Sequence, residues 1–184
     1  MNFNTKSPKI LLTGLPGCGK TTAIIKIVAN LKDVKTAGFY TQEIRQNRKR
    51  KGFRWTTFDG ASGILARLDI KGPFRVGKYG VDVAGFQKAA IPALDFEHTD
   101  AQLFVLDEIG KMECLSDKFV TAVRRLFASD RPVLATVAQK GHGLIAEVKN
   151  FPQTKLLKLT PQTRDKTITE VSQILSFLKK TSQL

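Results

Sequence analysis

Near its start the chain reads Lys9-Ile10-Leu11-Leu12-Thr13 and continues directly with Gly14-Leu15-Pro16-Gly17-Cys18-Gly19-Lys20-Thr21. A short apolar run bounded by Gly and Pro predicts a buried strand. After Thr21, apolar residues recur at helical spacing and predict a helix. The pattern Gly-x4-Gly-Lys-Thr between a strand and a helix predicts a phosphate-binding P-loop.

Each part of this loop has a role in binding phosphate. Its glycines let successive backbone N–H groups turn inward around phosphate oxygens, and the helix N-terminus adds partial positive charge. Lys20 is expected to reach the β and γ phosphates, and the Thr21 hydroxyl is expected to hold Mg2+. The alternative is a glycine turn with a purely structural role, and the flanking strand and helix disfavour it.

The length and composition indicate one domain. A chain of 184 residues with 42% hydrophobic residues and 12 Phe can bury a sizeable core. No repeat, linker or low-complexity segment divides it. We therefore expect a single domain over residues 1–184, with flexible ends at 1–8 and 181–184.

Charge and cysteine content restrict the partners and the compartment. There are 30 Lys and Arg against 16 acidic residues, a net charge of +14 that favours nucleotides, nucleic acid or anionic membrane surfaces. Two cysteines form no disulfide framework, which indicates a reducing compartment. No apolar run approaches the roughly 20 residues of a membrane span, and residues 1–9 do not resemble a signal peptide. We expect a cytoplasmic protein without membrane association, and a monomer by default.

A basic hairpin is predicted after the first helix. Residues 36–45 have the aromatic and β-branched content of a strand, and residues 52–58 alternate as a second strand does. Between them lies a cationic turn around Arg48–Lys51. This turn is either a solvated charge run or a clamp for phosphates or an RNA backbone. Residues 61–80 give weak signals and are predicted to be irregular, and a helix disturbed in its middle by Pro92 should follow.

A second motif follows a buried strand. Four apolar residues, Leu103-Phe104-Val105-Leu106, end in the adjacent carboxylates Asp107 and Glu108. With a P-loop upstream, they predict a Walker B strand in which Asp107 binds Mg2+ through water. Glu108 is predicted to orient or deprotonate an attacking water. Lys111 is placed to stabilise charge on the γ phosphate, unless it pairs with Glu113 or faces solvent.

The remaining elements complete an alternating pattern. Residues 132–138 and 156–159 read as strands, and Arg164 lies where the latter leads into the last helix. Ligands of open α/β sheets bind at such junctions, so Arg164 contacts either the base or a structural ion-pair partner. The pattern predicts a three-layer α/β/α sandwich of the P-loop NTPase fold, with a mainly parallel sheet and an antiparallel hairpin at one edge.

The predicted catalytic residues are Glu108, Lys20 and Lys111, and the predicted metal ligands are Thr21 and Asp107. The predicted nucleotide-binding residues come from the loop, the second motif and the last junction: Gly14, Leu15, Pro16, Gly17, Cys18, Gly19, Lys20, Thr21, Thr22, Leu103, Phe104, Val105, Leu106, Asp107, Glu108, Ile109, Gly110 and Arg164.

The combined motifs resemble the cancer-related nucleoside triphosphatases, a family of P-loop proteins first described from thermophiles. The resemblance rests on Gly14–Thr21, Gly38-Phe39-Tyr40-Thr41 with Glu43 and Arg45, Gly52-Phe53, Val76-Gly77-Lys78-Tyr79 with Val81, and Asp107-Glu108-Ile109-Gly110-Lys111-Met112-Glu113. It implies slow, Mg2+-dependent hydrolysis of ATP, GTP and other triphosphates to diphosphate and phosphate. The chain departs from the family in having Thr163-Arg164-Asp165 where Asn-Arg-Asp is frequent, and in its more cationic hairpin turn.

Two other functions fit the same motifs. A nucleotide or nucleoside kinase would transfer the phosphoryl group to an acceptor held by Thr41, Glu43 and Arg45. A nucleotide-switched RNA- or DNA-binding protein would grip its partner through the Arg48–Lys51 turn, with strong salt dependence. Hydrolysis of the triphosphate is the favoured function.

Overall fold

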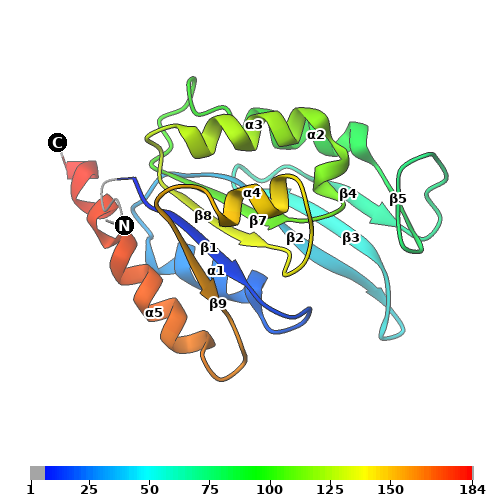
Figure 1. The fold of residues 1–184 in the computed structure, drawn as a ribbon, viewed down its shortest axis with the longest axis horizontal. Helices are drawn as coiled ribbons and strands as arrows, with labels where there is room; N and C mark the ends of the chain where they lie inside the picture. The colour runs from blue at the N-terminus through cyan, green and yellow to red at the C-terminus, as the bar shows by residue number, and fades with distance from the viewer. Residues whose placement is uncertain (1–6, 184) are drawn as a thin grey trace.

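The computed structural model describes residues 7–183, and over this range nine strands form one mixed sheet (Figure 1). The strand order is β5-β6-β4-β3-β2-β7-β8-β1-β9. Five neighbouring strands are mutually parallel: β2 (Thr36–Gln46), β7 (Leu103–Ile109), β8 (Val133–Val137), β1 (Lys9–Thr13) and β9 (Thr154–Lys158). The predicted α/β sandwich built on a parallel sheet is confirmed.

The antiparallel half of the sheet is larger than predicted. The strand β3 (Lys49–Thr57) pairs with β2 as the expected hairpin, but β4 (Ser62–Arg67), β6 (Tyr79–Val81) and β5 (Arg75–Val76) continue the sheet beyond it. The prediction that residues 61–80 are irregular is therefore wrong for these strands. They are short, and the hydrogen bonds that stabilise them come from β3 and from one another, so their own composition carries little signal.

Helices cover both faces of the sheet. The helices α1 (Lys20–Asn30) and α5 (Arg164–Leu175) lie on one face, and α2 (Val83–Ala93), α3 (Asp117–Ala128) and α4 (Leu144–Lys149) lie on the other (Figure 1). Two 3-10 helices, η1 (Glu113–Leu115) and η2 (Ser176–Gln183), complete the element set of the described chain.

The central strands explain this layering. In β1, Ile10 and Leu12 pack into the core beneath α1 and α5, whereas Leu11 packs into the core beneath α2, α3 and α4. Side chains alternate between the two faces of a strand, so a strand covered on both faces must be apolar at every position. β1 is covered on both faces and pairs in parallel with β8 and β9. The loop that follows β1 therefore lies at the carboxyl ends of the parallel strands.

A side-chain cap marks the start of α2. Asp82 accepts a hydrogen bond from the Gly85 N–H at 2.9 Å and begins α2. The helix ends at Ala93, so Pro92 lies in its last turn and not in its middle as predicted, and Leu94 and Phe96 lie beyond it. Pro92 has no N–H to continue the helical hydrogen-bond ladder, and the helix ends one residue after it.

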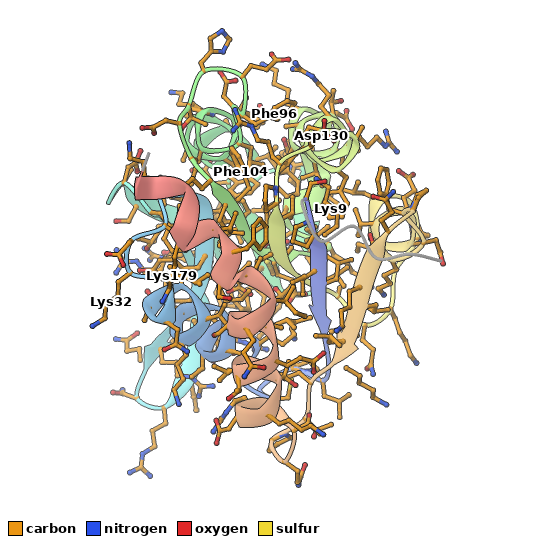
Figure 2. The ribbon with its side chains drawn as sticks, turned by 90° about the vertical axis from the view of Figure 1, so that its left-hand side faces the viewer. Lys9, Lys32, Phe96, Phe104, Asp130 and Lys179 are labelled. Carbon is orange, nitrogen blue, oxygen red and sulfur yellow. The ribbon has the colours of Figure 1, made fainter. Side chains whose placement is uncertain are left out.

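Lys9 fixes the start of β1 (Figure 2). Its ammonium is buried and donates hydrogen bonds to the backbone carbonyls of Leu126 at 3.3 Å, Ser129 at 2.8 Å and Arg131. Burial lowers the pKa of Lys9 to about 8, and the nearby Asp130 carboxylate acts against this shift. These contacts tie β1 to the end of α3.

The chain ends were expected to be flexible. Residues 1–6 and 184 lie outside the described residues, whereas Ser7 and Pro8 are buried and the Pro8 carbonyl accepts a hydrogen bond from the Val133 N–H at 2.9 Å. Within the described part of the chain, none of the helices combines the length and apolarity required to cross a bilayer.

Substituting Gly38 tests the contact between the two halves of the sheet. Gly38 in β2 has φ +107°, and a Cβ atom there would lie 2.0 Å from the Val105 carbonyl oxygen of β7. We expect Gly38→Ala to lower the free energy of unfolding by about 2–4 kcal/mol in urea denaturation, because strain adds to a steric clash.

The matched control is Gly60→Ala, since Gly60 has φ +100° but a Cβ atom at this position would have nothing within 4 Å. It should cost only the backbone strain, about 1 kcal/mol. Equal losses in the two variants would show that the close approach of β2 to β7 is unimportant.

Candidate active site

The P-loop joins the end of β1 to the first turn of α1. Gly19 is the N-cap of α1 with φ +96°, a left-handed conformation that favours glycine. No side chain of the described residues caps the amides of this first turn. The N–H groups are therefore directed at the space in front of the helix with its partial positive charge, as anion binding requires.

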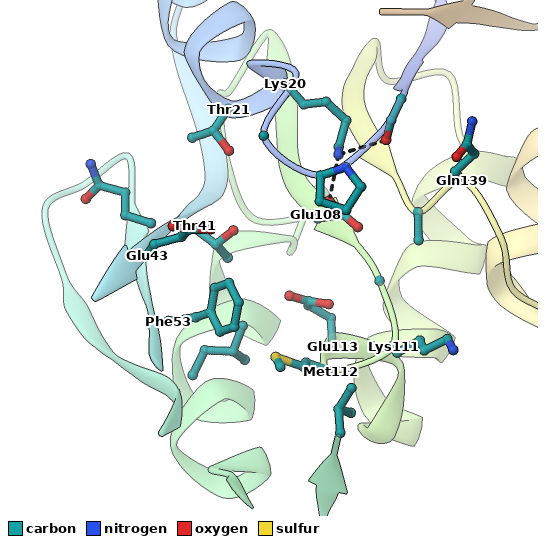
Figure 3. A pocket seen from close by; sticks show the side chains of 18 of the residues that line it. Lys20, Thr21, Thr41, Glu43, Phe53, Glu108, Lys111, Met112, Glu113 and Gln139 are labelled. Atoms are coloured by element: carbon teal, nitrogen blue, oxygen red, sulfur yellow. Dashed lines mark hydrogen bonds and ion pairs between the residues drawn. The ribbon is translucent and has the colours of Figure 1, made fainter. Parts of the chain in front are cut away.

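Lys20, the first residue of α1, lies beside this space (Figure 3). Its ammonium donates a hydrogen bond to the Gly14 carbonyl at 3.2 Å and forms an ion pair with Glu108 Oε2 at 3.5 Å. The structure thus brings the predicted catalytic lysine and the predicted catalytic carboxylate together, although 88 positions separate them in the sequence numbering.

Asp107 is the most constrained carboxylate of the site, with 1% of its surface exposed. It accepts hydrogen bonds from Thr136 Oγ1 at 2.6 Å, Thr21 Oγ1 at 2.7 Å and the Thr41 N–H at 3.5 Å. Burial raises the pKa of Asp107, and the hydroxyls of Thr136 and Thr21 act against this. Thr136 was missed by sequence reasoning, although a threonine within a fully buried strand was an available signal.

Glu108 follows Asp107 and faces the cavity instead of the core. Burial raises the pKa of its carboxyl, Lys20 lowers it, and Asp107 raises it further. The net result is a carboxylate that binds a proton more readily than a free glutamate, next to a cation.

A cavity of about 840 Å³ opens beside these groups (Figure 3). The P-loop and the end of β7 form one wall, and the β2–β3 hairpin, β4, β5, the loop after β7 and the loop after β8 contribute the rest. The lining includes Gly14, Pro16, Gly17, Gly19, Lys20, Thr21, Thr22, Thr41, Gln42, Glu43, Arg50, Phe53, Leu65, Val76, Glu108, Gly110, Lys111, Met112, Glu113, Gln139 and Lys140.

Glu113 is a buried acid that sequence reasoning treated only as a partner for Lys111. It is 4% exposed, and a Cβ atom on Gly110 would lie 2.8 Å from Glu113 Oε2 and 3.2 Å from Glu108 Oε1. The two carboxyl groups therefore flank Gly110. Burial raises the pKa of Glu113 to about 8, and the charge of Glu108 contributes to the shift. Lys111 is exposed and points away from both carboxyls (Figure 3).

Several predicted binding residues position the site without lining the cavity. Leu103, Phe104, Val105, Leu106 and Ile109 are fully buried in the two cores and hold Asp107 and Glu108 at the end of β7.

Three further predicted residues lie around the P-loop. Leu15 is 65% exposed, and Cys18 is buried against the core beneath α1 and α5. Arg164 Cδ would lie 3.0 Å from a Cβ atom on Gly19, and Arg164 Nε lies 3.6 Å from Asp165 Oδ1. Arg164 therefore reaches the P-loop and also has an acidic neighbour.

Some of the cations of the basic hairpin form ion pairs. Glu43 binds both Arg45, with an Nη2–Oε2 distance of 2.5 Å, and Arg50, with an Nη1–Oε1 distance of 2.7 Å. Arg48 and Lys49 are exposed at the turn. Part of the predicted cationic run is therefore neutralised within the hairpin, and Arg50 contributes to the cavity wall.

The predicted metal ligands fit a magnesium ion by their chemistry. Thr21 Oγ1 and Asp107 Oδ2 lie 2.7 Å apart and are hard oxygen donors beside the P-loop. Mg2+ takes few protein ligands and fills its remaining positions with water and substrate phosphate oxygens, so one hydroxyl and one carboxylate suffice.

A glycine loop at an uncapped helix N-terminus, its lysine, and an acidic pair ending a second parallel strand define the P-loop class of nucleoside-triphosphate-binding proteins. The chain belongs to the NTPase family, because the family model of that description matches residues 9–172.

Relatives from two domains of life align over nearly the whole chain. It is 39% identical over 169 residues to the protein of Thermotoga maritima named nucleoside-triphosphatase THEP1, covering 92% of this chain and 96% of that relative. It is 37% identical over 177 residues to the human cancer-related nucleoside-triphosphatase, covering 88% and 93%. The crystal structure of THEP1 from Aquifex aeolicus superposes with a TM-score of 0.83 at 37% identity, covering 93% and 99% of the two chains.

Neutralising Glu113 tests the burial of this acid. The raised pKa means that the folded protein binds more protons than the unfolded chain between about pH 4.5 and 8, so the contribution of Glu113 to stability is lost as pH rises through this window. We expect Glu113→Gln, which cannot ionise, to gain stability relative to the unmodified protein as pH rises from about 5 to 8.

Urea denaturation at several pH values measures this difference. The control is Glu97→Gln, since Glu97 is on the surface in an ion pair with Arg125. A stability difference for Glu113→Gln that stays constant across this pH range would contradict the assignment.

Proposed function

We propose that this protein hydrolyses the β–γ phosphoanhydride bond of ATP, GTP and other nucleoside triphosphates, with Mg2+ as cofactor. The observation that carries the proposal is the meeting of Lys20, Thr21, Asp107 and Glu108 beside the uncapped N-terminus of α1. Membership of the NTPase family and the names of the relatives support it.

The P-loop would bind and polarise the triphosphate tail. Backbone N–H groups between Gly14 and Thr21 would donate to phosphate oxygens, and the ammonium of Lys20 would draw charge from the β and γ phosphates. Lys20 is already held at this end by the Gly14 carbonyl and by Glu108. Little reorganisation is then needed when charge develops on the leaving diphosphate.

Glu108 would position the attacking water and take its proton. It lines the cavity, and its raised pKa makes it a better base than an exposed glutamate. Thr21 and Asp107 would hold Mg2+, which when bound neutralises charge on the β and γ phosphates.

The site supports broad base tolerance. The groups assigned to binding and catalysis act on the triphosphate tail. Arg164, the predicted base contact, lies at the P-loop next to Asp165. If the protein recognises its substrate through the triphosphate tail, nucleotides with different bases can bind.

We also place the protein in a reducing, cytoplasmic compartment, because both Cys18 and Cys114 are free thiols.

Removing the carboxylate of Glu108 separates binding from chemistry. We expect Glu108→Gln to retain triphosphate binding while hydrolysis falls by about 100-fold or more, because the amide cannot accept the proton. Phosphate release and equilibrium binding of a triphosphate analogue measure the two effects.

Two variants accompany this measurement. Lys20→Ala should lose turnover together with affinity, and Glu170→Gln, which alters a surface ion pair with Lys155, should change neither. Undiminished phosphate release by Glu108→Gln would remove Glu108 from the mechanism.

Removing divalent cations tests the cofactor. We expect a chelator to abolish phosphate release and excess Mg2+ to restore it, since Thr21 and Asp107 offer oxygen ligands beside the P-loop. Full turnover in the presence of the chelator would show that hydrolysis needs no metal ion.

A further inference from the structure

The cavity extends beyond the Lys20–Glu108 pair, toward the β2–β3 hairpin and the loop after β7 (Figure 3). We name this part the hairpin-side pocket and define it by Thr41, Phe53, Leu65, Val76, Met112 and Glu113. Its wall differs in chemistry from the phosphate end. None of these six residues belongs to the P-loop, to which the proposed function assigns the triphosphate tail.

Most of the hairpin-side pocket is apolar. Phe53, Leu65, Val76 and Met112 belong to or pack against the core beneath α2 and α3, yet they also line the cavity. An apolar wall with a few polar groups that fix orientation is typical of a site for an organic ligand. Phe53 offers an aromatic surface and Met112 a polarisable thioether, which both pack favourably on planar rings.

One acid is directed into this pocket. The Glu113 carboxyl points into the space between Phe53 and Glu108 (Figure 3). It is 4% exposed, and over residues 7–183 no side chain donates a hydrogen bond to it or pairs with it. Backbone groups of Glu113 itself and of Gly110 only partly offset its burial. A buried carboxyl of this kind is stabilised by a ligand that brings an N–H or O–H donor.

The cations around this pocket are already engaged or directed elsewhere. Arg50 donates to Glu43 Oε1 at 2.7 Å and to the Tyr79 hydroxyl at 3.1 Å, and its guanidinium lies 5.1 Å from the Phe53 ring centroid. Lys111 points away (Figure 3). Among the described residues of the hairpin and the loop after β7, no uncommitted cation therefore faces the pocket, which disfavours a phosphorylated or carboxylated ligand.

We propose that the hairpin-side pocket binds an uncharged nucleoside, with its base packed against Phe53 and Met112 and a base N–H directed at Glu113. A nucleobase has apolar faces and a hydrogen-bonding edge, which match the aromatic wall and the carboxyl. The inference rests on the proposed function, because the P-loop end is assigned there to the triphosphate.

Calorimetric titration tests the proposal with adenosine, guanosine and cytidine as probes. The full chain is used both free and saturated with Mg2+ and a non-hydrolysable triphosphate analogue. At least one nucleoside should bind the analogue-loaded protein, and purine riboside, whose base has no N–H donor, should bind more weakly than adenosine. Phe53→Leu keeps an apolar side chain but loses the ring, and should weaken nucleoside binding by about tenfold.

The matched control is Phe74→Leu, since Phe74 is 44% exposed and does not line the cavity. It should leave nucleoside binding unchanged, and circular dichroism checks that both variants fold. Absence of nucleoside binding to the loaded protein, equal affinity in Phe53→Leu, or displacement of the analogue by the nucleoside would each overturn the proposal.

The same titrations distinguish this inference from the proposed function. Phosphate release without nucleoside binding rejects the pocket and leaves the function in place. If the analogue fails to bind and no phosphate is released, the proposed function fails. In that case, nucleoside binding to the free protein that is weakened by Phe53→Leu supports the pocket, and binding that is absent or unchanged rejects it.

Discussion

The hydrogen bond from Thr21 to Asp107 fixes the first turn of α1 against the end of β7, across 86 positions of sequence. Asp107 is buried and also accepts hydrogen bonds from Thr136 in β8 and from the Thr41 N–H in β2, so four elements are tied at one carboxylate. Lys20 precedes Thr21 in the chain and Glu108 follows Asp107, and Lys20 and Glu108 form an ion pair. The geometry of the active site therefore depends on this one contact.

Several carboxyl groups lie close together at the site, although the net charge of the protein is strongly positive. Burial raises the pKa of Asp107, Glu108 and Glu113, and of these three carboxyls Glu108 forms an ion pair with Lys20. Burying several carboxyls near one another costs stability unless cations or donors compensate. This arrangement opposes folding.

The antiparallel half of the sheet supplies the second wall of the site. The β2–β3 hairpin carries Arg50 and Phe53 to the cavity, and Glu43 forms ion pairs with two of the arginines that make this segment basic in sequence. Arg48 and Lys49 are exposed at the turn, and Arg45, Arg50 and Arg54 are exposed along the two strands. A charge run in sequence is thus a poor measure of the free charge on a surface when its acidic partner lies on the paired strand.

The sequence by itself determined the P-loop, the β7 strand and the acidic pair, because each is a contiguous segment with its own spacing and apolar period. From these the parallel sheet and the meeting of Lys20 with Glu108 could be predicted. Only the tertiary structure decided that Thr136 holds Asp107, that Glu113 is buried beside Glu108, and that strands between residues 61 and 81 extend the sheet. Burial and strand pairing depend on segments distant in the chain, so no local pattern encodes them.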